Sequence, residues 1–566
     1  MKRILLTLAI SCFTLGAWAQ DTDYTYYAEM LSRNNYYGTA RSVALGNAMT
    51  ALGGDLGSVG INPAGSAVNN YGQITFTPAL LFQSTDAAWS ANGNDGYGPF
   101  VNTPHTKFNL PNAGGTAVFY NDYGSKLRYV TVGFIVNSTN TFLNYASARG
   151  TNDRTSFLGN LAATASTLSQ SDWRDDIWSA YDTGQIFGYG KSGGYTGSNQ
   201  LINNSETYSY VPGTLNQTVD YVTYGTKSDI LLNIGFNISD KFYFGFNLGL
   251  PTAKYRRAYG FYEAAQAPEA FPVNIEDNNG IHVGVEGEPT TYYKSSSNVT
   301  KLETEAAGVY GKFGFIWLPT SHLRLGAAIQ TPTSLEIIEN FSYDAEINYT
   351  DKEFRGYLRN PYSGDDQYRL RTPYIVNLGA AYTFGGFGLL SVDYELTDYS
   401  VMKYSDMDYN FLSTSGWDAN NQCNRLFRGI SHALRVGAEV KPLPELSLRA
   451  GYSLTTSPER YAQDDAGNII TSTNWDMSMG TALTGLRYVN SNTSAYSLGI
   501  GYSSEGSFFA DAAVRLTRYP TQHYSPYYFG EYTVYDKNGS IVEAGVPDIT
   551  LDRKIVDVLV TFGWRF

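Results

Sequence analysis

The chain has little cysteine and no long apolar stretch, and each shortage restricts its architecture. Only Cys12 and Cys423 occur among 566 residues. Cys12 lies in an N-terminal segment that we expect to be removed, so the mature chain cannot form an intramolecular disulfide. After that segment no run approaches ~18 consecutive apolar residues, which excludes a transmembrane helix. A chain of this size without disulfides must be stabilised by extensive burial or by closure of hydrogen-bonded strands.

Basic residues are also scarce. Without Lys2 and Arg3, which lie in the removed segment, 37 basic residues face 52 acidic ones, a net charge of −15. Nucleic acid requires clustered Lys and Arg, so we expect no nucleic-acid partner. The five histidines show no pair at metal-ligand spacing, and no Ser/His arrangement or defined carboxylate pair is recognisable. We therefore predict no catalytic residues, no metal site and no cofactor.

The N-terminus has the pattern of a secretory signal. Lys2 and Arg3 precede an apolar stretch over 4–15, and Ala17-Trp18-Ala19 provides a small-x-small cleavage site. We assign residues 1–19 to the signal peptide, so the mature protein is exported.

The last eleven residues alternate between two faces. One face carries Val556, Val558, Val560, Phe562, Trp564 and Phe566. This period of two predicts a strand that is long enough to cross a bilayer when tilted. A terminal Phe closing such a strand resembles the assembly signal of outer-membrane β-barrels, which implies the barrel-assembly machinery as a partner. From this segment alone, the edge strand of a secreted β-sandwich is the alternative.

The same alternation recurs in pairs of segments joined by short turns. Residues 230–238 and 242–250 flank Ser239-Asp240 and predict a hairpin. Four more pairs are 309–317 with 323–329, 374–384 with 387–394, 434–440 with 446–452, and 496–502 with 508–516. Adding strands near 72–84, 107–121 and 127–137 and the final strand gives about fourteen, an even number as bacterial barrels have.

The hairpins are separated by long polar connections. These run over 139–226, 264–298, 346–367, 405–429, 456–493 and 521–552. Short turns on one side and long loops on the other are typical of an all-β transmembrane antiparallel barrel, here residues 72–566. We place this barrel in the outer membrane of a Gram-negative-type bacterium. Arg435, Glu439 and Arg449 fall on the face opposite the large apolar residues, and we predict that they face the lumen, because lipid contact would cost a few kcal/mol each.

Residues 20–71 do not resemble a membrane strand. Small residues recur at helical spacing over 38–52, Gly53-Gly54 stops the pattern, and Asp55 and then Asn62-Pro63-Ala64-Gly65 follow. Pro63 pushes Asn62 toward an extended conformation, the Asn62 amide can bond nearby backbone, and Gly65 permits a sharp exit. We predict a helical plug, or hatch, inside the barrel. By itself Asn-Pro is an ordinary turn.

The combination resembles the FadL/TodX family of hydrophobic-compound transporters. The matching residues are Ala44, Gly46, Ala48, Ala51, Asp55, Asn62, Pro63 and Ala64. The resemblance implies a fourteen-stranded barrel closed by the hatch, capture of hydrophobic ligands in an outer groove, and a lumen site beside the hatch. It also implies sideways exit near the third strand, where Gly133 is our candidate for a wall opening.

A helical insertion is predicted at about 152–182, within the first long loop. The ligand-capture candidates are Phe157, Leu158, Leu161, Trp173, Ile177 and Trp178, with Ser171 expected to cap the second helix. The insertion resembles the helical extracellular loops that form the family's capture groove. The alternative is a cap in which these faces pack against each other.

We therefore predict a channel for passive uptake of hydrophobic small molecules, with long-chain fatty acids as the leading class and aromatic hydrocarbons next. Outer-membrane lipid is the other expected partner. The alternative is a FadL-like barrel that docks or shuttles secreted proteins through its long loops. A hydrolase is disfavoured because no nucleophile is recognisable, and a TonB-dependent receptor because the pre-barrel segment is too short. An apolar lumen pocket against the hatch would favour transport.

Overall fold

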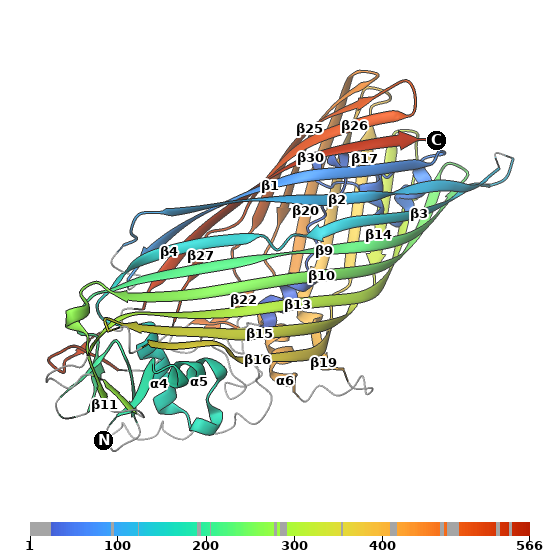
Figure 1. Ribbon diagram of the computed structural model, residues 1–566. Coiled ribbons are helices and arrows are strands. Elements are labelled where there is room, and N and C mark those ends of the chain that lie inside the picture. Colours follow the sequence, from blue (N-terminus) through green and yellow to red (C-terminus); the bar gives the residue numbers. More distant parts are fainter. Residues whose placement is uncertain are drawn as a thin grey trace.

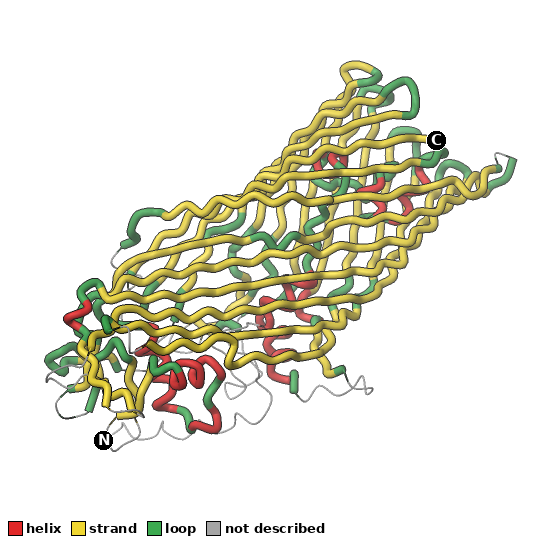
Figure 2. The backbone as a smooth tube through the Cα atoms, viewed as in Figure 1, coloured by secondary structure: helices red, strands yellow, loops and turns green. Residues whose placement is uncertain are grey.

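The computed structural model describes residues 24–566 except 92–95, 123, 190–193, 204, 206, 277–279, 284–290, 352–354, 408–415, 464–468, 473–485, 528–532 and 543–545. Fourteen antiparallel strands close into a barrel, which confirms the predicted fold class (Figures 1 and 2). The last strand pairs with the first from Gln73↔Arg565 to Ser90↔Asp548, so the wall is closed by hydrogen bonds.

Several wall strands consist of two segments in line. The wall runs β1 Gln73–Ser90, β2 Val101–Asn121, β3 Leu127–Asn140 with β4 Asn144–Asn152, β9 Leu215–Ile238, β10 Phe242–Ala265, β13 Thr291–Trp317, β14 Leu323–Gln330 with β15 Ser334–Tyr349, β17 Ile375–Thr383 with β16 Arg355–Arg371, β18 Gly388–Asp398 with β19 Lys403–Asp406, β20 Ile430–Leu443, β21 Leu446–Thr455, β25 Thr493–Ser503, β26 Phe508–Arg518 and β30 Asp548–Arg565.

The remaining elements are short. The helices are α1 Tyr24–Ser32, α2 Ala40–Ala44, α3 Leu56–Val59, η1 Pro63–Val68, α4 Phe157–Thr167, η2 Gln170–Asp172, α5 Asp175–Asp182, η3 Pro268–Ala270, η4 Tyr399–Val401 and α6 Asp418–Phe427. The loop strands are β5 Ile186–Tyr189, β6 Gly194–Gly197, β7 Leu201–Ile202, β8 Ser209–Tyr210, β11 Pro272–Glu276, β12 Gly280–Val283, β22 Arg460–Gln463, β23 Ile469–Ile470, β24 Arg487–Tyr488, β27 Gln522–Tyr524, β28 Val534–Tyr535 and β29 Ile541–Val542.

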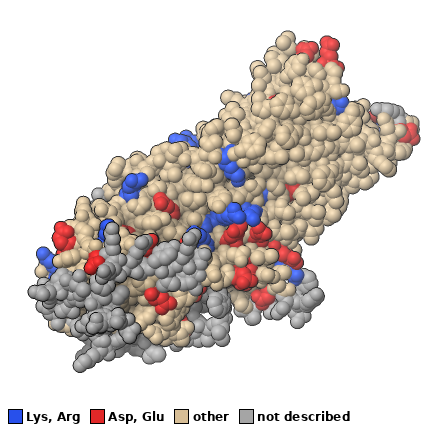
Figure 3. Space-filling model, in the orientation of Figure 1, with Lys and Arg blue, Asp and Glu red and all other residues tan. Residues whose placement is uncertain are grey.

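A belt of apolar side chains covers the outside of the barrel. Large exposed members include Leu232, Phe246, Phe313, Leu378, Leu434, Leu448, Leu498, Ile500, Val514 and Phe562. Aromatic residues such as Trp317, Tyr382, Phe508 and Trp564 lie near the short-turn end. Lys and Arg lie beside Asp and Glu over the loop end, and a broad region without charges separates them from the short turns (Figure 3). This outer-membrane β-barrel thus has a lipid-facing belt with aromatic residues at its boundary.

Among the residues that the structure describes, no helix is long and apolar enough to cross a membrane.

The strands toward the loop end extend well beyond the predicted segments. β10 reaches Ala265 and β13 begins at Thr291, and their ladder runs from Phe242↔Trp317 to Ala264↔Ser295. Above the apolar belt the outer face of a strand contacts water, so charged residues such as Lys254, Arg256 and Glu303 replace the outward apolar side chains that mark a membrane segment. Parts of the predicted loops are therefore strands.

Candidate functional site

Residues 36–69 of the predicted plug, called the hatch from here on, form a compact segment inside the barrel. Hydrogen bonds among their own side chains and backbone hold this segment together. The Thr39 side chain accepts the Ser42 N–H and so caps α2, and Asp55 Oδ1 accepts the Gly57 N–H at 2.9 Å and caps α3. The Thr39 hydroxyl also donates to Asp55 Oδ1 at 2.6 Å, which joins the two helix starts. Asp55, a predicted hatch residue, thus fixes the internal geometry of the hatch.

The predicted helix over 38–52 is much shorter in the structure. α2 spans only Ala40–Ala44, and Gly46 and Asn47 follow with φ values of +61° and +60°. A Cβ on Gly46 would lie 3.0 Å from the Tyr452 backbone nitrogen of β21. The small residues therefore permit close contact with the barrel wall instead of one continuous helix.

Asn62 joins the hatch to the wall. Its Nδ2 donates to Thr50 O at 2.7 Å within the hatch and to Phe315 O at 3.1 Å and Ala327 O at 3.4 Å in β13 and β14. Its Oδ1 accepts the Ala64 N–H at 3.0 Å and caps η1, whose first residue is Pro63. The buried Asn62 amide therefore donates to three carbonyls and accepts from one N–H, which is close to the number of hydrogen bonds that an amide side chain can form.

Cross-strand glycines form seats for the hatch on the inner wall. Gly235, Gly245 and Gly314 lie side by side in β9, β10 and β13. A Cβ on Gly245 would lie 2.2 Å from the Pro63 carbonyl carbon, and one on Gly314 would lie 1.9 Å from Asn62 Oδ1. The absence of side chains here lets the predicted Asn-Pro motif lie directly on the strands.

The same arrangement occurs twice more. Gly326 pairs with Gly379 beneath Thr50, and Gly437 pairs with Gly451 beneath the segment that contains Leu45. Added Cβ atoms would approach the hatch backbone to 2.2 Å at Gly326 and 2.4 Å at Gly437. Three glycine seats thus distribute the hatch over much of the circumference, a role that the strand pattern alone did not indicate.

Inward polar side chains of the wall also bind the hatch backbone. Lys312 Nζ donates to Gly60 O at 2.8 Å, Arg324 Nη1 to Leu52 O at 2.6 Å and Asn247 Nδ2 to Val59 O at 2.8 Å. Asp393 Oδ2 accepts the Thr50 N–H at 2.6 Å. These bonds supply partners for backbone groups that the short hatch helices leave unpaired.

Arg435, Glu439 and Arg449 all point inward and are buried. Arg449 bridges Glu439 at 2.6 Å and Asp511 at 2.5 Å, and Arg435 bonds Glu395 at 3.1 Å. Glu439 also lies 3.5 Å from Arg41 of the hatch, and Arg435 lies over the Tyr36 ring at 5.1 Å. The three predicted lumen residues therefore contact hatch and wall together.

The first described helix, α1, fills an apolar part of the lumen. Tyr24, Tyr27 and Leu31 of α1 are buried in a cluster that includes Tyr255 and Tyr368 of the wall. The rings of Tyr24 and Tyr368 meet edge to face at 6.0 Å. The apolar lumen space that we expected a ligand to occupy is therefore filled by the chain itself.

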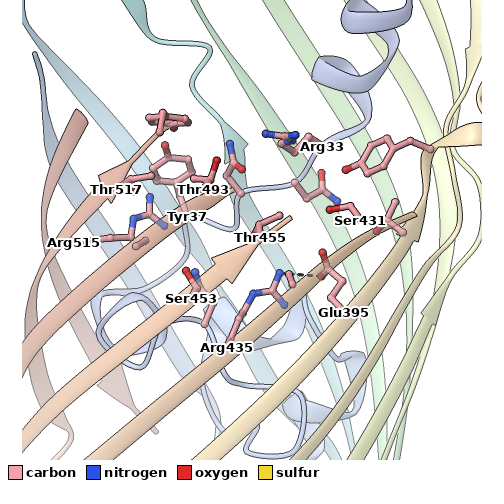
Figure 4. Close-up of a pocket in the computed structure, with 18 residues that line it drawn as sticks. Arg33, Tyr37, Glu395, Ser431, Arg435, Ser453, Thr455, Thr493, Arg515 and Thr517 are labelled. Atoms are coloured by element: carbon pink, nitrogen blue, oxygen red, sulfur yellow. Dashed lines mark ion pairs between the residues drawn. The ribbon is translucent and has the colours of Figure 1, made fainter. Parts of the chain in front are cut away.

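The lumen cavity between α1 and the hatch is polar (Figure 4). Its volume is about 70 Å³, and its labelled lining residues are Arg33, Tyr37, Glu395, Ser431, Arg435, Ser453, Thr455, Thr493, Arg515 and Thr517. Arg435 Nη1 is buried and has no hydrogen-bond partner among the described residues. The cavity therefore fits a polar or anionic group and is not the apolar pocket against the hatch that would favour transport over docking.

A seam interrupts the wall at its third strand. The ladder between β2 and β3 ends at Asn112↔Asn137, and β4 pairs only with β9, from Asn144↔Thr223 onward. Residues 101–111 of β2 therefore pair with β1 alone within the described part of the chain. Between β3 and β4 the backbone arches through Phe142, which has a φ of +50°. We use "seam" for residues 101–111 of β2 and the facing residues 138–145 (Figure 1).

Gly133, the predicted wall-opening residue, lies outside the seam. It pairs with Thr116 of β2 and with Asn233 of β9, so both ladders are continuous there. The interruption begins after Asn137, where Asn140 Oδ1 accepts the Thr141 and Phe142 N–H groups and supports the arch. The Asn140 side chain that sustains this turn was the signal available in the sequence.

The predicted capture helices form the core of a cap over the loop end. Leu158, Leu161, Trp173 and Ile177 are buried, and Phe157 and Trp178 pack against the same cluster. Their partners include the wall residues Tyr293 and Ile347 and Phe271 of the loop between β10 and β13. Ser171 belongs to η2 and does not cap the second helix, which begins at Asp175. In this structure the six side chains form packing contacts of a cap, the alternative interpretation of the insertion.

Glu263 anchors the cap to β10 above the apolar belt. Its carboxylate accepts the N–H groups of Phe157 at 2.9 Å and Leu158 at 3.4 Å, at the start of α4, and also bonds Asn199 and Gln217. Burial raises the pKa of Glu263 to about 7, although the four donors stabilise the carboxylate and act to lower the pKa.

Cap stability is expected to fall as pH rises from about 4.5 to about 7, because the folded-state pKa of Glu263 exceeds its ordinary value of 4.5. The buried carboxyl keeps its proton over this interval while the unfolded chain loses it, and the difference amounts to about 3 kcal/mol. The protection factors of the α4 amides, which are their exchange rates corrected for the intrinsic pH dependence of amide exchange, should be higher at pH 5 than at pH 8. Glu263→Gln should remove this dependence, and the exposed Glu269→Gln should preserve it. Equal protection at both pH values in the unaltered protein would contradict the assignment.

No group of three His, Cys, Asp or Glu that could hold a metal ion occurs within the part of the chain that the structure describes.

No family model matches the chain, and no curated protein matches it by sequence. Among solved structures it is similar to a Pseudomonas aeruginosa FadL homologue, with 11% identity, a TM-score of 0.48 and coverage of 94% of this chain and 99% of that one. The Pseudomonas putida toluene transporter TodX gives 12%, 0.44, 95% and 99%, and the Ralstonia pickettii toluene transporter TbuX gives 12%, 0.42, 94% and 99%. These are barrels of the FadL and TodX kind, which the N-terminal motif resembles.

Proposed function

We propose that the protein is an outer-membrane channel for passive uptake of hydrophobic small molecules, with long-chain fatty acids as the leading class. The observation that carries this proposal is the combination of a hatch bonded to the wall across the bore and a seam in the wall beside it. The resemblance of residues 44–64 to the FadL/TodX motif supports the same function.

The hatch is bonded to the wall across the bore, so a molecule inside the lumen would leave through the side wall. A direct path to the short-turn end would break the bonds of Asn62, Lys312, Arg324 and Asp393 to wall or hatch backbone. At the seam no backbone ladder joins residues 101–111 of β2 to the facing residues 138–145, so separating these two parts of the wall breaks no ladder hydrogen bonds. A hydrophobic molecule gains free energy by partitioning directly into the bilayer.

An amphiphile with an anionic head group fits the lumen better than a purely apolar ligand. The cavity presents arginine side chains, including the Arg435 Nη1 that has no partner among the described atoms, and a carboxylate would supply one. Tyr399 lines the cavity and also belongs to the apolar cluster around α1. A head group in the cavity therefore places its tail where α1 now packs, so tail binding requires α1 to move.

The test is the amount of lipid that co-purifies after gentle extraction, measured by mass spectrometry. Thr455→Trp places a large side chain in the cavity and should lower bound fatty acid roughly tenfold. Leu454→Trp on the opposite face of β21 is the matched control and should leave it unchanged, since adjacent residues of a strand point to opposite faces. Uptake of a labelled fatty acid into proteoliposomes should fall in parallel. Recovery of a protein partner without lipid would favour the docking function instead.

A further inference from the structure

One lysine bridges the seam. Lys107 lies on the part of β2 that has lost its ladder to β3, and its Nζ donates to Gly225 O of β9. It also lies 3.3 Å from Thr226 Oγ1 of β9 and 3.4 Å from Thr141 O of the arch. A single ammonium thus connects β2 with both strands on the other side of the seam.

The acceptors of Lys107 are all neutral. Two are backbone carbonyls and one is a hydroxyl, and no carboxylate lies within ion-pair distance among the described residues. Two lysines on the outside of the wall near this level differ, because Lys254 lies 2.5 Å from Glu305 and Lys301 pairs with Asp344. The buried Lys227 of β9 donates to neutral oxygens of residues 31–34. A hydrogen bond from an ammonium to a carboxylate is about twice as strong as one to a neutral acceptor. Lys107 would therefore exchange its partners for an anion.

The bridge lies at the upper edge of the apolar belt. Thr226 pairs with Lys254 of β10, which belongs to an exposed charged band with Arg256 and Glu303. Four residues before Lys254 on the same strand, Leu250 begins the run of exposed apolar side chains. A carboxylate at Lys107 would thus lie at the level of the lipid head groups, with its tail beside the belt.

A second cation lies at the seam, because Arg553 Nη1 of β30 donates to Leu143 O of the arch at 3.2 Å. The Gln83 side chain exchanges two hydrogen bonds with the Tyr145 backbone, at 2.8 Å and 3.0 Å, in place of a strand partner. His105 of β2 stacks on the Tyr145 ring with centroids 3.7 Å apart. The Gln83 and His105 contacts hold β4 against β1 and β2, and Lys107 is the cation that joins β2 itself to β9.

The arch also connects the seam to the lumen. Phe142 belongs to the apolar cluster that surrounds α1 and meets the Tyr255 ring edge to face at 5.4 Å. Displacement of α1 by a ligand tail would therefore loosen the arch whose Thr141 carbonyl accepts a bond from Lys107.

We propose that Lys107 is a clasp across the seam that an anionic head group releases, so that the channel selects carboxylate amphiphiles over neutral compounds of equal chain length. The carboxylate takes the ammonium from Gly225 O, Thr226 Oγ1 and Thr141 O, the bridge between β2 and β9 is lost, and the tail passes into the bilayer. A neutral alcohol or hydrocarbon cannot compete for the ammonium in this way. This inference rests on the proposed function and adds the residue at the seam that selects the head group.

The experiment compares uptake of palmitate and hexadecanol by proteoliposomes that contain the full-length protein. The unaltered protein should prefer palmitate, and Lys107→Met should lower the palmitate-to-hexadecanol ratio at least tenfold while Lys107→Arg retains most of it. Lys301→Met, which removes an exposed lysine of the same wall, is the matched control and should leave the ratio unchanged. If Lys107→Met does not form a heat-resistant barrel, Thr226→Val removes one acceptor and should accelerate palmitate uptake.

The possible failures can be distinguished. If the unaltered protein takes up neither compound, the proposed function is wrong, and the proposed role of Lys107 is then wrong as well. If it takes up both and Lys107→Met changes both rates by the same factor, or neither, the channel function stands and the clasp is overturned. An unchanged palmitate rate in Thr226→Val would overturn it as well.

Discussion

Arg449→Met is expected to lower the free energy of unfolding of the barrel by about 3–5 kcal/mol, because it leaves two buried carboxylates without their partner. Arg449 bridges Glu439 and Asp511, and all three side chains are at most 6% exposed. Arg41 of the hatch, 3.5 Å from Glu439, cannot reach both carboxylates in the same geometry. Urea-induced loss of the heat-modifiable gel band, or of strand circular dichroism in detergent, measures the effect.

An exposed arginine of the same wall provides the control. Arg256 pairs with Glu303 at 2.6 Å on the outside of the barrel, with about 40% of each side chain exposed. Solvent screens such pairs, so Arg256→Met should change stability far less than Arg449→Met. Adding Glu439→Gln and Asp511→Asn to Arg449→Met should recover part of the loss, since the unpaired charges are then removed. Equal effects of the two single substitutions would show that the inward pairs do not stabilise the barrel.

The strand count could be predicted from the sequence because the bilayer imposes a local rule. Each membrane-spanning residue faces either lipid or lumen, so alternation such as that of Leu232, Ile234 and Phe236 is visible within ten residues. Arg435, Glu439 and Arg449 followed from the same rule. The strand extensions of β10 and β13 beyond the belt did not, because their outer faces carry charged residues such as Lys254 and Glu303 where a membrane segment has apolar side chains.

The position of the hatch in the chain could be predicted from the sequence, but the wall residues that it contacts could not. The Asn62-Pro63 turn is a local signal, whereas its seat depends on glycines 172 to 252 positions further on, which only the register of β9, β10 and β13 brings together. A glycine within a strand pattern indicates a bulge or a close approach and does not say what approaches.

The seam and the cap depend on contacts that are distant in the sequence. Lys107 has no distinguishing neighbours in the sequence, and its role follows from the end of one ladder and the carbonyl of Gly225 in another strand. Likewise, the apolar faces around Leu161 and Ile177 predicted helices correctly, but burial against Tyr293 and Ile347 decides between cap core and open groove. Periodicity shows that a face is apolar and leaves its partner open.

Asn62→Ala is expected to loosen the hatch and raise the conductance of the channel. The substitution removes bonds to Thr50 O, Phe315 O and Ala327 O and the cap of η1, four bonds in all, a loss of about 4 kcal/mol at roughly 1 kcal/mol for each bond. A loss of that size raises the population of an unseated hatch by a factor of about 1000. Single-channel recordings in planar bilayers should show more frequent openings, and cells should become more sensitive to large hydrophilic antibiotics.

Asn62→Asp separates the two roles of this side chain. Aspartate retains an oxygen that accepts the Ala64 N–H but has no amide to donate to the carbonyls of Phe315 and Ala327, so it should open the channel nearly as much as alanine. Gly314→Ala should have a similar effect from the wall side, since a Cβ there would lie 1.9 Å from Asn62 Oδ1. Asn69→Ala removes one bond, from Nδ2 to Gly54 O at 2.9 Å within the hatch, and should change conductance little. Conductance that stays at the unaltered level in Asn62→Ala, Asn62→Asp and Gly314→Ala alike would show that the amide and the glycine seat do not hold the hatch in the bore.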